Sequence, residues 1–313
     1  MIKLNILYVI DVYSWAYDFN ACEQGVYSEH NITRKPLLDI TMDDLKGIDI
    51  LYIHGPNIWK EISDELIVKT RKQYPNIKII GVYSVESKLM YPDVDLVITT
   101  SSNFYSTCCE MYKNYTCPVI FMPKGIDDEF FKPSAKLGDN FGWAGRKAEV
   151  KRAHLLDLLG YQIKRKSDHK DIQFVKGRDR TPMLNFYHSL KGLVLTSSSE
   201  ALPRTVLEAM ACGIPIVATS VGTLPLIIAN QWLVPVNPEG KVVKEIDKRL
   251  TLLSKNRNLC EEVGKRNRKF IEENWNWRLL QPYWDLIFTE VSKEHNVSIK
   301  IYDERLRKQW SIK

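Results

Sequence analysis

Residues 197–222, SSSEALPRTVLEAMACGIPIVATSVG, carry the pattern that decides the fold. Pro203 suits the first position of a helix and Gly213 suits its end, so a helix is expected between them. The apolar runs on either side are expected to be strands. Glu200 then lies in the loop between strand and helix, and Glu208 lies inside the helix. Both carboxylates are predicted to face one crevice.

This arrangement indicates a ligand site. In open α/β sheets, ligands bind outside the carboxyl ends of the strands, where Glu200 and the later Gly222 are expected to lie. Carboxylates accept hydrogen bonds from sugar hydroxyls. For an arbitrary pair of glutamates at this spacing, helix capping and surface solvation are the alternative.

Short runs rich in isoleucine, leucine, valine and tyrosine recur along the chain, as expected for buried parallel strands. The expected strands are Lys3–Ile10, Ile48–Ile53, Ile77–Tyr83, Leu96–Thr99, Asn140–Ala144, Ile172–Val175, Leu193–Thr196, Pro215–Thr219 and Trp232–Val234. Stretches with helical spacing lie between them, for example Trp59–Tyr74. The alternation predicts an α/β chain built from two Rossmann-like, doubly wound halves.

The length of 313 residues allows two domains with ordinary cores. The segment 122–133, MPKGIDDEFFKP, suits a connection between them, because it holds two prolines, a glycine and an acidic pair. We therefore expect domains at residues 1–133 and 134–285, followed by a helix and basic tail at residues 286–313.

Composition narrows the class of protein. A hydrophobic fraction of 44% and a charged fraction of 26% are ordinary for a soluble protein, and no apolar run approaches the roughly 18 residues that span a bilayer. Residues 1–11 read as a first strand and not as a signal peptide. The six cysteines lack CxxC spacing, so we expect reduced thiols, no metal site and a cytoplasmic protein.

The net charge of +6 is uneven, since residues 146–180 hold eleven lysines and arginines against five acidic residues. This basic segment suits phosphate contacts or weak attraction to an anionic membrane surface. A solvated face is the alternative.

The flanks of the two glutamates make the pattern specific. The spacing E-x7-E from Glu200 to Glu208, followed by AMACGIPIVAT and a glycine turn, resembles the donor site of retaining glycosyltransferases of family 4, also called group 1. Residues 125–133, GIDDEFFKP, are similar to the interdomain motif of that family, and Asn276 and Trp277 are similar to its C-terminal element. The resemblance implies the GT-B architecture, with the acceptor side in the first domain and the nucleotide-sugar site in the second.

The resemblance also implies roles for single residues. Arg146 and Lys151, in GWAGRKAEVK, match the cations that bind the donor diphosphate, and they neutralise charge that develops on it as it leaves. No metal is then required. An exposed basic helix start is the alternative. The remaining donor-site expectations are the ribose diol for Glu208, the hydroxyls of the sugar for Glu200, the phosphates for the backbone of Gly222 and Thr223, and neighbouring positions for Arg204, Ser199 and Gly145.

The N-terminal half departs from the family. The glycine-rich turn expected after the first strand is replaced by residues 11–17, DVYSWAY, and no histidine follows the strand that ends at Val82. His54 is the nearest alternative for a catalytic histidine, with Asp11 or Glu86 also possible occupants of the cleft. For a lone histidine at a strand end, a structural role is the alternative.

The expected function is transfer of a sugar, with retention, from a UDP-sugar or another nucleotide diphosphate sugar to a carbohydrate or glycolipid acceptor. A second hypothesis makes the acceptor a hydroxymethylated base of viral DNA, because the basic segment suits phosphate contacts. A third is a catalytically silent protein that binds a nucleotide sugar.

Overall fold

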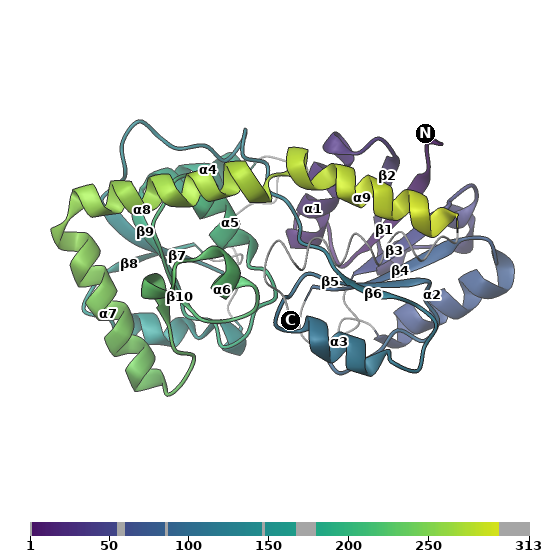
Figure 1. The fold of residues 1–313 in the computed structure, drawn as a ribbon, viewed down its shortest axis with the longest axis horizontal. Helices are drawn as coiled ribbons and strands as arrows, with labels where there is room; N and C mark the ends of the chain where they lie inside the picture. Colours follow the sequence, from purple (N-terminus) through teal and green to yellow (C-terminus); the bar gives the residue numbers. More distant parts are fainter. Residues whose placement is uncertain (1, 55–59, 85–86, 146–147, 167–179, 294–313) are drawn as a thin grey trace. The chain divides into compact units, whose positions relative to one another are not determined.

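The computed structural model describes residues 2–54, 60–84, 87–145, 148–166 and 180–293. The chain forms two compact units: the first holds Met1–Gly125 together with the chain from Trp277 onward, and the second holds Ile126–Asn276. The chain therefore passes from one unit to the other after residues 125 and 276, whereas the expected boundaries followed residues 133 and 285. Both units are doubly wound and parallel, as predicted (Figure 1).

The first unit contains a six-stranded parallel sheet of order β2-β1-β3-β4-β5-β6. Its strands are β1 Asn5–Ile10, β2 Asn31–Pro36, β3 Ile50–His54, β4 Lys78–Tyr83, β5 Leu96–Thr99 and β6 Val119–Phe121. The order reverses between β1 and β3, which is the position where open α/β sheets form a ligand crevice at the carboxyl ends of their strands.

Helices cover both faces of this sheet. They are α1 Ala16–Tyr27, α2 Lys60–Gln73, α3 Tyr105–Met111 and α9 Trp277–Ser292. Leu66 of α2 and Cys108 of α3 share one buried cluster with Leu51 of β3. On the other face, the ring of Tyr52 lies 6.0 Å from that of Trp284 in α9. Burial on both faces explains why these strands are almost continuously apolar.

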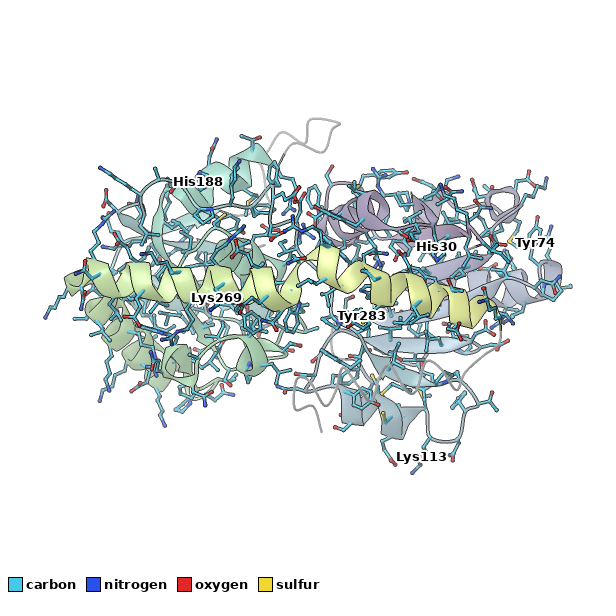
Figure 2. The ribbon with its side chains drawn as sticks, turned by 45° about the horizontal axis from the view of Figure 1, so that its top comes forward. His30, Tyr74, Lys113, His188, Lys269 and Tyr283 are labelled. Carbon is cyan, nitrogen blue, oxygen red and sulfur yellow. The ribbon has the colours of Figure 1, made fainter. Side chains whose placement is uncertain are left out.

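The C-terminal helix α9 belongs to the first unit because its indole groups are bound there. Trp277 Nε1 donates to Glu23 Oε2 at 2.9 Å, and Trp284 Nε1 donates to the carbonyl of Pro123 at 3.0 Å. His30, just before β2, lies 3.2 Å from the carbonyl of Asp285 under the same helix (Figure 2). Because of these long-range contacts, the second unit ends at residue 276, whereas the sequence predicted an end at residue 285.

The second unit contains a five-stranded parallel sheet of order β11-β10-β9-β7-β8. Its strands are β7 Asn140–Ala144, β8 Ile163–Lys166, β9 Leu190–Leu195, β10 Ile216–Thr219 and β11 Leu233–Val234. The carboxyl ends of β7, β9 and β10 are therefore neighbours along one edge. The expected strand at 172–175 lies outside the described residues.

The helices of the second unit are α4 Thr181–His188, α5 Arg204–Ala211, α6 Leu224–Ile227, α7 Glu239–Lys255 and α8 Arg257–Phe270, followed by a π-helical turn at Ile271–Trp275. Short 3-10 helices are η3 Glu149–Lys151, η4 Ala153–Leu158 and η5 Asn230–Trp232, with η1 Leu37–Asp39 and η2 Met42–Leu45 in the first unit. Helix α5 packs against β9, β10 and α8, and six of its eight residues are buried.

Three strands were not predicted, and all lie at a sheet edge. Strand β2 (NITRKP) and strand β8 (IKRK) are polar, because an edge strand buries less of its surface. Strand β6 has only three residues. Strands β2 and β8 therefore lack the continuous apolar signal of a central strand, and β6 is apolar but too short to give one.

The two segments at which the chain passes between the units lie side by side. The N–H of Ile126 donates to the carbonyl of Trp275 at 3.1 Å, and Ile126 pairs with Asn276 as an isolated parallel bridge. A Cβ added to Gly125 would lie 2.7 Å from the backbone nitrogen of Trp277. The glycine is therefore needed for the close approach of the two passing segments.

Candidate active site

The stretch that decided the fold has the predicted local structure. Strand β9 is followed by the loop that carries Glu200. Helix α5 begins at Arg204, so Pro203 is its N-cap and lies one position before the predicted first helical residue. Gly213 ends the helix in the left-handed region, with a φ of 71°. Strand β10 follows. Glu200 therefore lies at the carboxyl edge, and Glu208 lies in the second half of α5.

Two residues predicted from separate motifs are in direct contact. Lys151 Nζ lies 2.5 Å from Glu200 Oε1, and the Ser197 hydroxyl donates to the same oxygen at 2.6 Å. The side chain of Lys151 is 22% exposed and that of Glu200 is 11% exposed, so solvent reaches both. The carboxyl edge thus carries an accessible cation beside an accessible carboxylate. Arg146, the other expected cation, lies outside the described residues.

Glu208 has a different environment from the one expected for a ligand contact. It is 2% exposed. Its Oε1 forms ion pairs with Arg180 and with Arg204, the latter at 2.8 Å, and its Oε2 accepts a hydrogen bond from the Tyr187 hydroxyl at 2.8 Å. Burial and the nearby carboxylate raise the pKa of Tyr187 well above its ordinary value. In this structure the carboxylate is the counter-ion of the buried Arg180 and the half-buried Arg204.

Sequence reasoning did not identify Arg180 or Tyr187. The sequence did indicate that Glu208 needs partners, because it lies on the apolar, buried side of α5. A buried carboxylate requires a cation and hydrogen-bond donors. The spacing of 28 residues between Arg180 and Glu208 gives no local pattern from which to choose the partner. Arg204 was expected only to lie near the donor site. It pairs with Glu208, which follows it by one turn of the same helix.

The glycine turn after β10 packs on the loop that carries Glu200. Gly222 has a φ of 54°, and a Cβ at this position would lie 2.3 Å from the carbonyl oxygens of Glu200 and Ala201. The N–H of Thr223 donates to the carbonyl of Ala201 at 2.8 Å. This N–H was expected to bind the donor phosphates, and here it instead fixes the loop. The following helix α6 has only one turn.

We predict that Gly222→Ala lowers turnover strongly, because the new Cβ must displace the backbone of Glu200 and Ala201. An expected effect of about 10²-fold follows from a displacement of about 1 Å at a reacting group. Steady-state kinetics and thermal unfolding should be measured together. Gly240→Ala is the control, since beyond its own helix backbone and chain neighbours no atom lies within 4 Å of the added Cβ. Unchanged turnover in Gly222→Ala would contradict this role of the turn.

The remaining expected donor-site residues lie along the same edge. Gly145 follows β7, and a Cβ there would lie 3.0 Å from the ring of Trp143. Ser199 is half-buried in the loop between β9 and α5. Because β7, β9 and β10 are adjacent, Gly145, Ser199 and Gly222 come from three neighbouring strand ends.

His54 ends β3 in the first unit, beside the position where the strand order reverses. It is buried, and its Nδ1 lies 3.2 Å from Lys124 Nζ, which also donates to the Ser84 hydroxyl at 3.3 Å. The ring of Tyr17 stacks on the imidazole at 4.4 Å. Burial and the Lys124 charge lower the pKa of His54 well below its ordinary value, so the imidazole is neutral near pH 7. Glu86 lies outside the described residues.

The lowered pKa of His54 predicts acid sensitivity. Below pH 6.5 the unfolded chain binds a proton at this histidine that the folded protein does not bind, so the free energy of unfolding falls as the pH falls. The expected loss is up to about 1.4 kcal/mol for each pH unit below that value. Urea unfolding at pH 7.5 and 5.5 should show a smaller pH effect in His54→Asn than in wild type. The exposed His154→Asn is the control. Equal pH effects in all three proteins would contradict the prediction.

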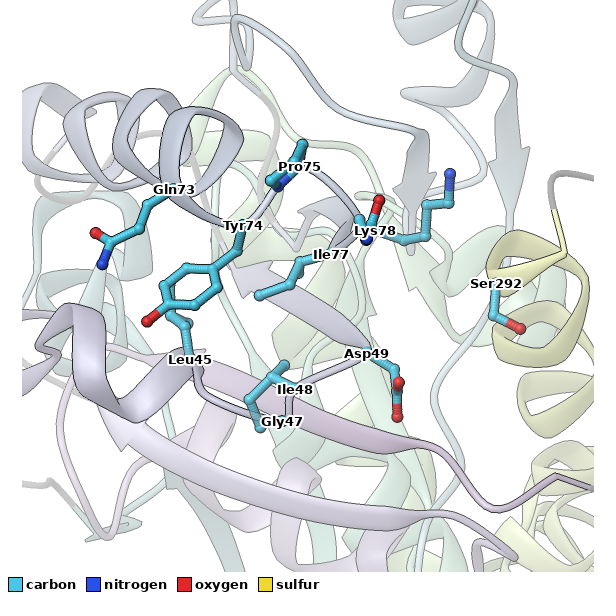
Figure 3. Close-up of a pocket in the computed structure, with 11 residues that line it drawn as sticks. Leu45, Gly47, Ile48, Asp49, Gln73, Tyr74, Pro75, Ile77, Lys78 and Ser292 are labelled. Atoms are coloured by element: carbon cyan, nitrogen blue, oxygen red, sulfur yellow. The ribbon is translucent and has the colours of Figure 1, made fainter.

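Three further features of the described part of the chain concern metals, membranes and cavities. Its histidine, cysteine and acidic side chains form no group of three or more that could hold a metal ion. Its helices include none long and apolar enough to cross a membrane. A cavity of about 320 Å³ is lined by Asp49, Tyr74, Lys78 and Ser292 among others (Figure 3). It lies at the amino ends of β3 and β4, so it is not part of the carboxyl edge.

Comparison with solved structures identifies the fold. Two parallel, doubly wound sheets of this kind are the GT-B architecture. Sucrose-phosphate synthase from Thermosynechococcus elongatus matches with a TM-score of 0.63 at 14% identity, covering 92% of this chain and 99% of that one. HepE from Anabaena, solved with UDP and glucose, matches with a TM-score of 0.65 at 11% identity, covering 92% and 100%. At these identities the likeness shows the fold alone.

One family matches part of the second unit. Residues 154–270 match the family described as "Glycosyl transferases group 1", which confirms the family-level resemblance found in the sequence. This range includes both glutamates, α5 and the glycine turn, whereas Lys151 precedes it. No curated protein matches the chain.

Proposed function

We propose that the protein transfers a sugar from a nucleotide diphosphate donor, a UDP-sugar by preference, to an acceptor hydroxyl. The contact between Lys151 and Glu200 carries the proposal. A fixed ammonium suits a diphosphate leaving group, and the adjacent carboxylate suits the hydroxyls of the transferred sugar. The group 1 match and the UDP in the Anabaena structure support this donor class.

The proposed mechanism depends on positioning more than on a strong protein base. Lys151 stabilises the negative charge that develops on the diphosphate, while Glu200 orients the sugar above it. The acceptor hydroxyl attacks the anomeric carbon, the bond to the diphosphate breaks, and the leaving phosphate accepts the hydroxyl proton. We propose retention of configuration from the family resemblance, and Arg146 as a second cation from its sequence position.

The acceptor is proposed as a carbohydrate or glycolipid, in line with the resemblance. The DNA hypothesis depends on the basic segment 146–180. Most of the excess positive charge of this segment lies in residues 164–180, and much of that range lies outside the described residues. No contact of the described residues favours it. The silent-binder hypothesis is separated from transfer by the experiment below.

Mass spectrometry of donor loss and product gain tests the proposal. A panel of UDP- and GDP-sugars is offered with saccharide, lipid-linked and hydroxymethylated-DNA acceptors. We expect a glycosylated saccharide or lipid and loss of an equal amount of donor. A DNA product would replace the acceptor proposal, whereas donor binding without hydrolysis or transfer would support the silent binder. Failure to bind any donor would reject the proposed function.

We also predict that turnover is independent of added metal, because Lys151 supplies positive charge at the diphosphate position. The enzyme is dialysed against EDTA and assayed with and without Mg²⁺ or Mn²⁺. The expected change is less than about twofold, since the charge is covalently part of the protein. Loss of turnover after dialysis, with recovery on adding metal, would contradict the prediction.

A further inference from the structure

Arg152, next to the candidate diphosphate cation, has an unusual backbone conformation. It lies between η3 and η4 with a φ of 45° and a ψ of 47°, in the left-handed region. A residue with a Cβ is disfavoured there, and glycine adopts the same conformation without that penalty. The arginine must therefore make contacts that compensate for its backbone.

The guanidinium of Arg152 binds three backbone carbonyls. Its Nε donates to Thr196 at 2.7 Å, its Nη1 to Val236 at 2.7 Å and its Nη2 to Ser197 at 3.3 Å. The residue is 5% exposed, and burial lowers the pKa of its guanidinium. These carbonyl groups lie just after β9 and β11. The Arg152 side chain therefore connects the ends of two strands to the turn that carries Lys151.

Backbone contacts complete this attachment. The Thr196 hydroxyl donates to the carbonyl of Lys151 at 2.7 Å, and the N–H of Ser198 donates to the carbonyl of Val150 at 2.8 Å. The turn that carries Lys151 is therefore held against the loop that carries Glu200. Their side chains meet at 2.5 Å as a result.

We infer that Arg152 is a positioning residue for recognition of the donor diphosphate. Its hydrogen bonds to the strand ends fix the turn, and the turn holds the Lys151 ammonium beside Glu200. Arg152 does not touch the donor in this arrangement, because its guanidinium is buried against the three carbonyls. The inference rests on the proposed function, since it assigns a diphosphate to this place.

Arg152→Gly separates positioning from backbone conformation, because glycine adopts the left-handed conformation readily while the whole side chain, including the guanidinium, is removed. Affinities for UDP and for uridine are measured by nuclear magnetic resonance titration. We expect the UDP affinity to fall about tenfold to a hundredfold and the uridine affinity to stay unchanged, because Lys151 acts only on the diphosphate. GDP with guanosine replaces this pair if wild type prefers it.

Two controls accompany this variant. Arg152→Lys keeps the charge and one donor group, so it should restore part of the lost UDP affinity, and it replaces Arg152→Gly if that variant does not fold. Arg249→Ala removes a comparable arginine that binds the carbonyls of Gln231 at 2.7 Å and Leu233 at 3.0 Å, at the start of β11. It should not change the ratio of UDP to uridine affinity.

The outcomes separate this inference from the function on which it rests. Wild-type UDP affinity in Arg152→Gly, or equal losses for UDP and uridine, would overturn the positioning role while leaving the function in place. A wild-type protein that binds no nucleoside diphosphate would overturn both. A selective loss for the diphosphate, partly restored by lysine, would establish the role.

Discussion

Lys151→Ala is expected to lower kcat/KM by about 10²–10³-fold, the usual loss when one preorganised group that stabilises developing negative charge is removed. The ammonium lies 2.5 Å from Glu200 Oε1 at the carboxyl edge of the second unit. Because the side chain is partly exposed, the variant should remain folded. Steady-state kinetics with the preferred donor, together with the melting temperature, measure the two effects separately.

Two controls make the Lys151 result specific. Lys241→Ala removes an exposed lysine at the start of α7 and should leave kcat/KM unchanged. Lys151→Arg keeps a cation and should retain more turnover than the alanine variant. If Lys151→Ala turned over donor as fast as wild type, the assignment of this lysine to the diphosphate would be wrong.

Glu208→Ala is expected to destabilise the protein by about 3–5 kcal/mol, because it leaves buried charge without its counter-ion. Arg180 and Arg204 both pair with this carboxylate, and the Tyr187 hydroxyl donates to it. The residue that the sequence pattern assigns to donor binding therefore also has a structural role in this arrangement. Chemical unfolding of wild type and variant measures the difference in free energy.

A surface ion pair is the matched control for Glu208. Glu262 pairs with Arg266 at 3.5 Å on α8, and both side chains are exposed. Glu262→Ala should change the free energy of unfolding by less than about 1 kcal/mol. If Glu208 only binds the donor, Glu208→Ala will lose donor affinity at unchanged stability, which would contradict the structural role. Loss of both properties would show that Glu208 has the two roles together.

The sequence alone determined the architecture and the local geometry of the carboxyl edge. Continuous apolar runs specify central parallel strands, because such strands are covered on both faces. Pro203 and Gly213 set the ends of α5 through their own backbone restrictions, and the first lies at the N-cap while the second has a φ of 71°. Glu200 was predicted from its place after a strand and Lys151 from the family resemblance, and the structure places the two side chains in contact.

Only the tertiary structure decided the long-range pairings. Four features depend on segments that are distant in sequence: the polar edge strands β2 and β8, the place of α9 in the first unit, the partners of Glu208 and the carbonyls bound by Arg152. Periodicity and turn chemistry act over a few residues, so they specify which elements form. A buried charge is satisfied by whichever partner the packed chain brings near it, and no local pattern specifies that partner.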